Sequence, residues 1–323
     1  AIPGAERVWI PSPPEAPLSI PFLSPERMIN RWLTILLVPL WISCNNGNRE
    51  VDKPVITVSI PPQKYLIEQL AGDLAEVNVM IPPGASPATY EPTLSQLGKL
   101  DRSHLYLKMG HLGFEQSWMD KIRGVNPHMK VVDLSAGIDL ITETDKEGHP
   151  HRNAAGEKNA HRHGTDPHTW MSVHNVRTMS QMIHEELVRL FPDKVSYLRK
   201  RFAQFETSLD NLHRSIEQIL AGKQESHFMI YHPALSYFAR DYQLHQHALE
   251  FEGKTPSPAH IRELTDLGRE KEIRAILVQQ EFDQDNAEVL ARDLYAEIIQ
   301  INPLDEDWYG QMRYIAKKLA DSL

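Results

Sequence analysis

One long amphipathic segment constrains the fold more than any other feature of this chain. It begins at Pro192 and Asp193 and runs to Gly222, a residue that commonly ends helices. Its apolar residues recur at spacings of three and four: Val195, Leu198, Phe202, Phe205, Leu209, Leu212, Ile216 and Ile219. Such a helix is about 40 Å long, enough to span two lobes. A coiled-coil dimer is the alternative.

Short apolar runs typical of strands lie on both sides of this segment, at 55–60, 77–81, 105–109, 130–134, 227–231, 243–248, 274–278 and 298–301. Helical patterns separate them, at 65–71, 94–103, 176–191, 233–241, 258–271, 286–295 and 308–319. Alternation of this kind favours parallel α/β units. We predict an α/β fold of two lobes with small, mostly parallel sheets, at 54–175 and 223–323. Helices within 176–222, including the long rigid one, join the lobes.

The N-terminal residues are typical of a targeting segment. Residues 28–44 hold Arg31, an apolar run too short to span a bilayer, and a final Ser43-Cys44. This is similar to a bacterial lipoprotein signal, in which Cys44 receives the lipid. A buried hairpin with a free cysteine is the alternative. We expect 1–27 to be a non-native or disordered extension and 45–53 to be a polar tether.

Composition excludes one class of partner. The formal net charge is −9, whereas a nucleic-acid-binding protein needs a basic face. The chain also holds 16 histidines and a single cysteine, so an intrachain disulfide is impossible. We therefore expect no nucleic-acid partner, and the histidines are the natural candidates for metal ligands.

Two histidines, in two different segments of the chain, are each next to a proline. His168 lies in Asp-Pro-His-Thr-Trp, and His232 directly follows a predicted strand and precedes Pro233. Ligands of open α/β sheets bind beyond the carboxyl ends of strands, and proline restricts the neighbouring backbone. His168 and His232 are therefore the leading metal ligands. Glu281 lies in a further segment of this kind, after the strand predicted at 274–278.

Several motifs in order resemble the ZnuA/TroA-like solute-binding proteins of zinc and manganese ABC transporters. They are Gly-Ala-Ser-Pro at 84–87, Tyr-Glu-Pro-Thr at 90–93, the His168 motif, and Tyr-His-Pro-Ala at 231–234. The resemblance covers about 53–323. It implies an exported, non-enzymatic protein, lipid-anchored on the periplasmic side, that acts as a monomer. Such a protein holds a divalent metal between its lobes and carries it to an inner-membrane ABC permease. A histidine at the position of His232 goes with zinc in this family, so zinc is expected over manganese.

Two positions depart from the family pattern. Ala88 stands where the family has a ligating histidine, and Asn302 where it commonly has aspartate. Three arrangements remain open. Another donor replaces the missing histidine, most plausibly Glu281, with Glu91, Gln279 and Asn302 as the lesser choices. In the second, His168 and His232 hold the metal with water or a loop histidine. In the third, the site is inactive or binds something else.

Other histidines offer secondary sites. His149, His151, His161 and His163 lie in a polar loop that either gathers zinc or is simply solvated, and His245 and His247 alternate along a predicted strand.

Two other functions compete with metal transport. An exported zinc hydrolase also uses three protein ligands, but the chain has no His-Glu-x-x-His motif. A surface adhesin or periplasmic metal chaperone on the same scaffold is hardly distinguishable by sequence.

Overall fold

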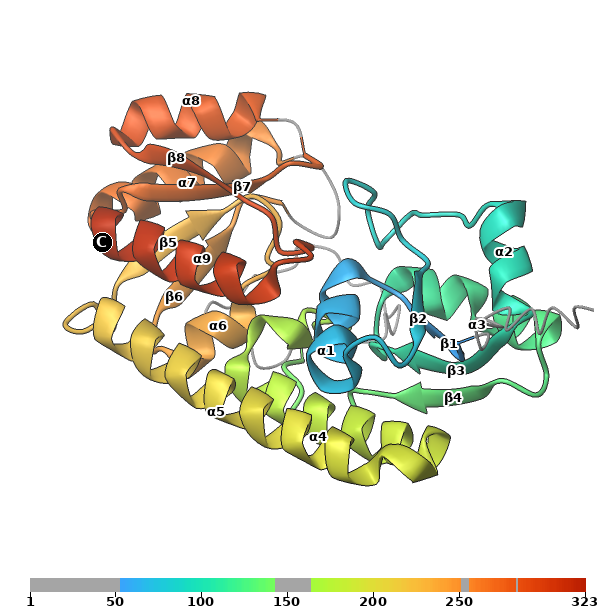
Figure 1. Ribbon diagram of the computed structural model, residues 1–323. Coiled ribbons are helices and arrows are strands. Elements are labelled where there is room, and N and C mark those ends of the chain that lie inside the picture. The colour runs from blue at the N-terminus through green and yellow to red at the C-terminus, as the bar shows by residue number, and fades with distance from the viewer. Residues whose placement is uncertain (1–52, 143–163, 251–255, 283) are drawn as a thin grey trace, which may run out of the picture. The chain divides into compact units, whose positions relative to one another are not determined.

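The computed structural model describes residues 53–142, 164–250, 256–282 and 284–323 (Figure 1). The predicted extension, the lipoprotein signal with Cys44, nearly all of the tether and the four loop histidines lie outside these residues.

The first lobe contains a four-stranded parallel sheet in the order β2-β1-β3-β4. Its strands are β1 (Val55–Val58), β2 (Glu76–Val79), β3 (Ser103–Lys108) and β4 (Lys130–Asp133). The helices along this part of the chain are α1 (Pro61–Ala71), α2 (Leu94–Leu100) and α3 (Gly113–Val125). All four residues of β1 are buried, as expected for a central strand covered on both faces.

The second lobe repeats this topology, with the order β6-β5-β7-β8 and all pairs parallel. Its strands are β5 (His227–Ile230), β6 (His245–Ala248), β7 (Ala275–Gln279) and β8 (Glu297–Ile301). Its helices are α6 (Ser236–Asp241), α7 (Pro258–Glu270), α8 (Asp285–Leu294) and α9 (Trp308–Ser322). In such sheets the strand order reverses between the two central strands, and ligands bind at the carboxyl ends there.

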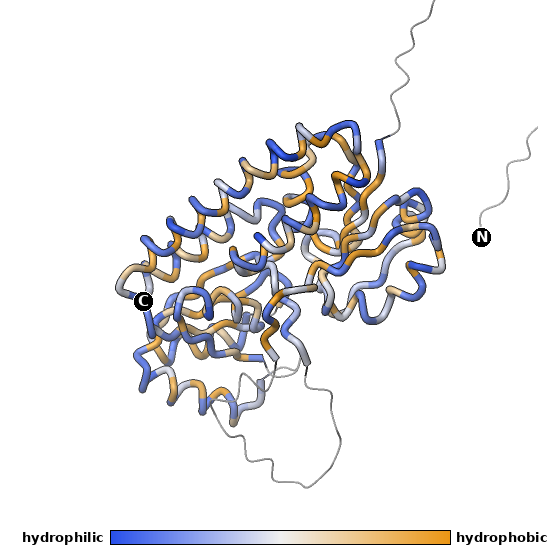
Figure 2. The backbone as a smooth tube through the Cα atoms, turned by 90° about the horizontal axis from the view of Figure 1, so that it is seen from below, coloured by the Kyte–Doolittle hydropathy of each residue, from blue (hydrophilic) through white to orange (hydrophobic). Residues whose placement is uncertain are grey.

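Two helices connect the sheets: α4 (Val173–Leu190) and α5 (Val195–Ile219). The 25 residues of α5 extend about 37 Å. Leu198, Phe205, Leu209, Leu212 and Ile216 of α5 are buried, as its periodicity predicts. α5 packs against α1 near the first sheet and against α9 near the second (Figure 1). Apolar and polar residues accordingly alternate along its tube in Figure 2. The predicted two-lobed α/β fold with a long connecting helix is confirmed.

Several predicted elements differ from the structure, mostly at their ends; α1, for example, begins at Pro61 and not at residue 65. α3 was not predicted, because it begins at Gly113 after Leu112 and therefore lacks the capping side chain that usually marks the start of a helix. The helix expected at 94–103 ends at Leu100, since Ser103 already belongs to β3. The helix expected from residue 233 begins at Ser236.

Candidate metal centre

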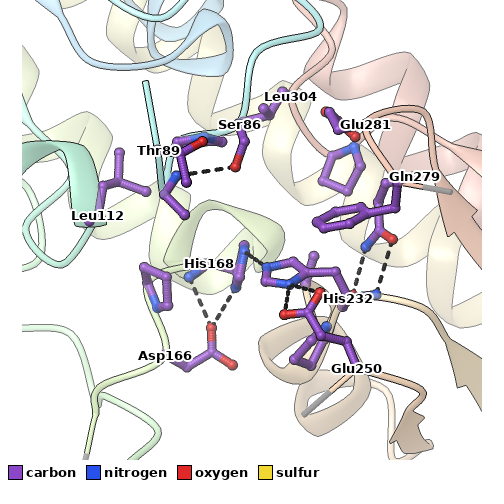
Figure 3. Close-up of a pocket in the computed structure, with 18 of the residues that line it drawn as sticks. Ser86, Thr89, Leu112, Asp166, His168, His232, Glu250, Gln279, Glu281 and Leu304 are labelled. Carbon is purple, nitrogen blue, oxygen red and sulfur yellow. Dashed lines mark hydrogen bonds and ion pairs between the residues drawn. The ribbon is translucent and has the colours of Figure 1, made fainter. Parts of the chain in front are cut away.

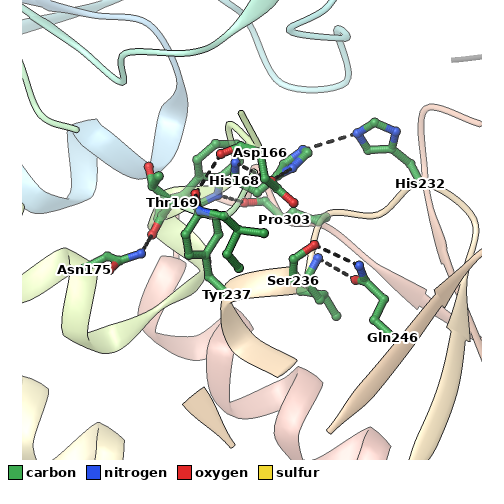
Figure 4. A network of polar contacts seen from close by, with 12 residues as sticks. Asp166, His168, Thr169, Asn175, His232, Ser236, Tyr237, Gln246 and Pro303 are labelled. Carbon is green, nitrogen blue, oxygen red and sulfur yellow. Dashed lines mark hydrogen bonds and ion pairs between the residues drawn. The ribbon is translucent and has the colours of Figure 1, made fainter. Parts of the chain in front are cut away.

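His168 is fixed by the short segment that precedes α4. Asp166 Oδ1 accepts a hydrogen bond from the His168 backbone N–H at 3.0 Å and lies 2.8 Å from the ring Nδ1. The Tyr237 hydroxyl donates to the Asp166 carbonyl at 2.9 Å, which ties the segment to α6 (Figure 4). Burial raises the pKa of Tyr237 to about 12, so this hydroxyl keeps its proton at neutral pH. The ring of His168 is thus oriented by its own loop.

His232 is fixed by the carboxyl ends of three neighbouring strands. It follows β5, and the side chain of Gln279, at the end of β7, binds both of its backbone groups. The His232 N–H donates to Gln279 Oε1 at 3.2 Å, and Gln279 Nε2 donates to the His232 carbonyl at 2.6 Å. Glu250, just beyond β6, places its carboxylate oxygens 3.1 and 3.2 Å from His232 Nδ1. These contacts leave Nε2 pointing into the space between the lobes.

The two imidazoles face each other through their Nε2 atoms, which are 3.3 Å apart (Figure 3). Each Nδ1 faces a carboxylate, an arrangement that favours the tautomer with the proton on Nδ1 and makes Nε2 the metal-binding atom. Two nitrogen donors at about 2.0–2.1 Å from one tetrahedral zinc are separated by about 3.3–3.4 Å. The observed separation fits that geometry.

Two buried carboxylates surround the histidine pair, and their burial strengthens their electrostatic effect on it. Asp166 is 5% exposed and Glu250 8% exposed, so both carboxylates act at low dielectric. Carboxylates that accept the Nδ1–H of a histidine hold its tautomer and increase its strength as a ligand. The Phe282 ring stacks on His232 at a centroid distance of 5.2 Å, and Trp170 packs beside His168. The centre is negatively charged, rigid and partly apolar, which suits a divalent cation.

The third predicted ligand, Glu281, borders the same cavity, which measures about 400 Å³. Its Oε2 is buried and has no hydrogen-bond partner among the described residues. However, the described part of the chain contains no group of three His, Cys, Asp or Glu side chains placed to hold a metal ion. The structure therefore brings His168 and His232 together, while Glu281 stands apart from the pair (Figure 3).

The other residues considered as metal ligands have different contacts. Gln279 is occupied by the backbone of His232. The Asn302 side chain accepts from the Leu304 N–H at 3.2 Å, a loop contact that aspartate also makes. Glu91 is exposed and does not line the cavity, whereas Ala88 does.

Sequence reasoning missed the two carboxylates that orient the rings. Asp166 is the first residue of the Asp-Pro-His-Thr-Trp motif, two residues before His168. This spacing lets an aspartate side chain accept a hydrogen bond from a following backbone N–H. Glu250 comes two residues after β6, where the strand-end rule directs attention. Its pairing with His232 depends on the strand order, which the sequence does not state.

Two α/β lobes, a connecting helix that contacts both, and a pair of carboxylate-oriented histidines between them define a solute-binding protein for a metal ion. The sequence profile described as "ZnuA: Zinc-uptake complex component A periplasmic" matches residues 56–322, and the chain belongs to this family. Membership confirms the predicted class, a metal-binding solute-binding protein of an ABC importer, and identifies a family of binding proteins rather than enzymes.

Individual relatives agree with the family. The chain is 28% identical over 292 residues to a putative metal-binding protein of Chlamydia trachomatis, covering 90% of this chain and 99% of that protein. It is 26% identical to the zinc-binding lipoprotein AdcA of Streptococcus pneumoniae, covering 90% of this chain but 58% of AdcA. A crystal structure of a ZnuA deletion mutant with zinc bound is 33% identical, with a TM-score of 0.74, and the match covers 84% and 98% of the two chains.

Proposed function

We propose that this protein captures Zn²⁺ through His168 and His232 and delivers it to an ABC importer. The observation that carries the proposal is the 3.3 Å separation of the two Nε2 atoms, each on a ring whose Nδ1 faces a carboxylate. Membership in a zinc-uptake family supports zinc as the cargo, and two imidazoles are ligands that zinc prefers. Manganese favours more oxygen donors than this pair supplies.

Glu281 is the proposed third protein ligand. A buried carboxylate oxygen without a partner is costly unless a cation or a donor satisfies it. Glu281 meets this condition in the cavity that His168 and His232 also line. A rotation of its side chain or a small closure of the lobes brings it to the metal. Two imidazoles and one carboxylate leave the fourth position of a tetrahedral zinc open.

Capture is coupled to protons, because a protonated imidazole cannot bind a metal. Zinc arriving between the rings replaces any proton that the two Nε2 atoms share. We expect the affinity for zinc to decrease as the pH falls, because protons then compete with zinc for the imidazole nitrogens.

We also propose that the protein acts as a monomer at the outer face of a bacterial inner membrane, held by a lipid on Cys44 and docked to an ABC permease. Support comes from the signal-like residues 28–44 and from a relative named as a lipoprotein. No helix within the described residues is long and apolar enough to cross a membrane.

Metal content tests the capture proposal directly. The purified full chain, loaded with zinc and dialysed, is expected to retain one zinc ion by mass spectrometry. His168→Ala and His232→Ala are each expected to lose it, whereas His128→Ala, an exposed histidine elsewhere, retains it. Glu281→Gln is expected to weaken binding, with Glu288→Gln on the exposed face of α8 as its control. Unchanged retention in both histidine variants contradicts the proposal.

A further inference from the structure

The cavity beside the histidine pair is much larger than a metal ion requires. Its volume is about 400 Å³, whereas a zinc-bound water needs on the order of 30 Å³. Pockets that enclose small organic ligands begin at roughly 300 Å³. The described residues therefore leave room for a metal together with a small molecule.

Ala88 borders this cavity, together with Ser86, Thr89 and Leu112. Figure 3 shows Ser86 and Thr89 above the pair of His168 and His232. A methyl group at position 88 donates nothing to a metal. Two imidazoles and the proposed ligand Glu281 leave the fourth position of a tetrahedral zinc open to a ligand from outside.

The residues that line the cavity indicate which kind of ligand fits there. Pro87, Pro167 and Phe282, which are partly exposed, offer apolar surface to a ring. No lysine or arginine occurs among the described residues that line the cavity, so a purely anionic chelator gains no partner there.

We infer that the open position is filled by a nitrogen donor from a small free chelator of the amino-acid type, so that zinc is held as a ternary complex of protein, metal and chelator. An imidazole or amine of the chelator replaces the side chain that Ala88 lacks. Its ring packs on the apolar wall. This inference rests on the proposed function, because it requires zinc on His168 and His232.

Free L-histidine is the probe, with imidazole as its single-donor counterpart. The full chain is equilibrated with zinc and radiolabelled L-histidine and then dialysed. We expect about one histidine to be retained per zinc, and none when zinc is omitted. We also expect zinc to dissociate at least tenfold more slowly when imidazole or L-histidine is present than when neither is.

Two substitutions at position 88 make the test specific. Ala88→His restores an imidazole within the chain, so zinc retention is expected to become independent of added histidine. Ala88→Leu fills the same space without a donor, so this variant is expected to retain no histidine while still binding zinc, more weakly, on the remaining ligands.

Zinc that dissociates from the wild type equally slowly with and without histidine or imidazole overturns the inference and leaves the proposed function standing. Histidine retained equally by the wild type and Ala88→Leu also overturns it, because the ligand then lies elsewhere. Failure of the proposed function gives a different result, namely zinc retention that does not depend on His168 or His232.

Discussion

The indole N–H of Trp308 donates to the backbone carbonyl of Trp170 at 2.9 Å, while the Trp170 indole donates to the carbonyl of Pro303 at 2.8 Å. Both tryptophans are almost completely buried. Trp170 is two residues beyond His168, and Trp308 begins α9 in the second lobe. Two hydrogen bonds therefore join the segment that carries His168 to the part of the chain that follows β8.

Trp308→Phe is expected to destabilise the protein, because it removes the donor and leaves the buried Trp170 carbonyl without it. An unsatisfied buried group costs about 1–3 kcal/mol, which chemical denaturation measures as a change in unfolding free energy. Trp118→Phe, on a half-buried helix face, is the matched control. If Trp308→Phe and the wild type have the same unfolding free energy, this hydrogen bond does not contribute to stability.

Glu250→Gln is expected to weaken zinc binding by roughly 10- to 100-fold, the usual effect of removing a group that orients a metal-binding histidine. The substitution keeps the volume of the side chain but removes its negative charge near His232 Nδ1. Competition with a fluorescent zinc chelator measures the change. Glu225→Gln is the control, since Glu225 also contacts a histidine, His245, at 2.9 Å but at the opposite, amino-terminal end of the strands. A similar loss in both variants points to an overall charge effect.

Glu115→Gln is expected to lower the unfolding free energy by about 1–3 kcal/mol. The side chain is 2% exposed, and its two oxygens accept the backbone N–H groups of Met109 at 2.6 Å and Gly110 at 2.7 Å. Although burial raises the pKa of Glu115, both oxygens are needed as acceptors, and a glutamine turns a donor toward one N–H. Urea denaturation checks this, with Glu76→Gln at an exposed site as the control. Equal losses in the two variants contradict the role of the buried carboxylate.

His227 predicts a pH dependence of stability. Burial lowers its pKa, as do the nearby positive charges of His245 and Lys271, against the opposing effect of Glu225 and Glu270. Because the pKa is lower in the folded state, the unfolded chain binds more protons as the pH falls below about 6.5. Stability is thus complete above that pH and decreases as the pH falls toward the lowered pKa.

His227→Gln is expected to reduce this decrease, measured as unfolding free energy at pH values of about 7.5, 6.5 and 5.5, which bracket the ordinary pKa of histidine. Its ring Nδ1 lies 2.9 Å from His247 Nε2, so the rings interact and the variant removes a coupled group. The exposed His104, replaced by glutamine, is the control. Identical pH profiles for wild type and His227→Gln contradict the role assigned to His227.

Much of the fold follows from local pattern. α5 was predictable because its apolar residues keep a helical period for 25 residues, and the strands because they are short, apolar and bounded by helical segments. α3 was not, because no capping side chain marks its start at Gly113. Helix ends such as that of α2 were misplaced where one element passes into the next within three residues.

The candidate metal centre was also only partly predictable, but the reason is different. His168 and His232 stand in distinctive motifs, whereas the partnership of His232 with Glu250 depends on β5 and β6 being neighbours in the sheet. Whether Glu281 reaches the metal depends on a side-chain rotation, which no sequence pattern encodes. Long-range geometry, and not residue type, limited the prediction.

The length of α5 has a consequence for how this protein tolerates change. Each residue added to a helix turns everything beyond it by about 100° and advances it by about 1.5 Å. Since α5 packs on α1 at one end and α9 at the other, an insertion or deletion within it turns one attachment surface away from its partner. The number of residues in α5 thus sets the alignment of the two imidazoles, and changes of length are far less tolerable there than changes of its exposed side chains.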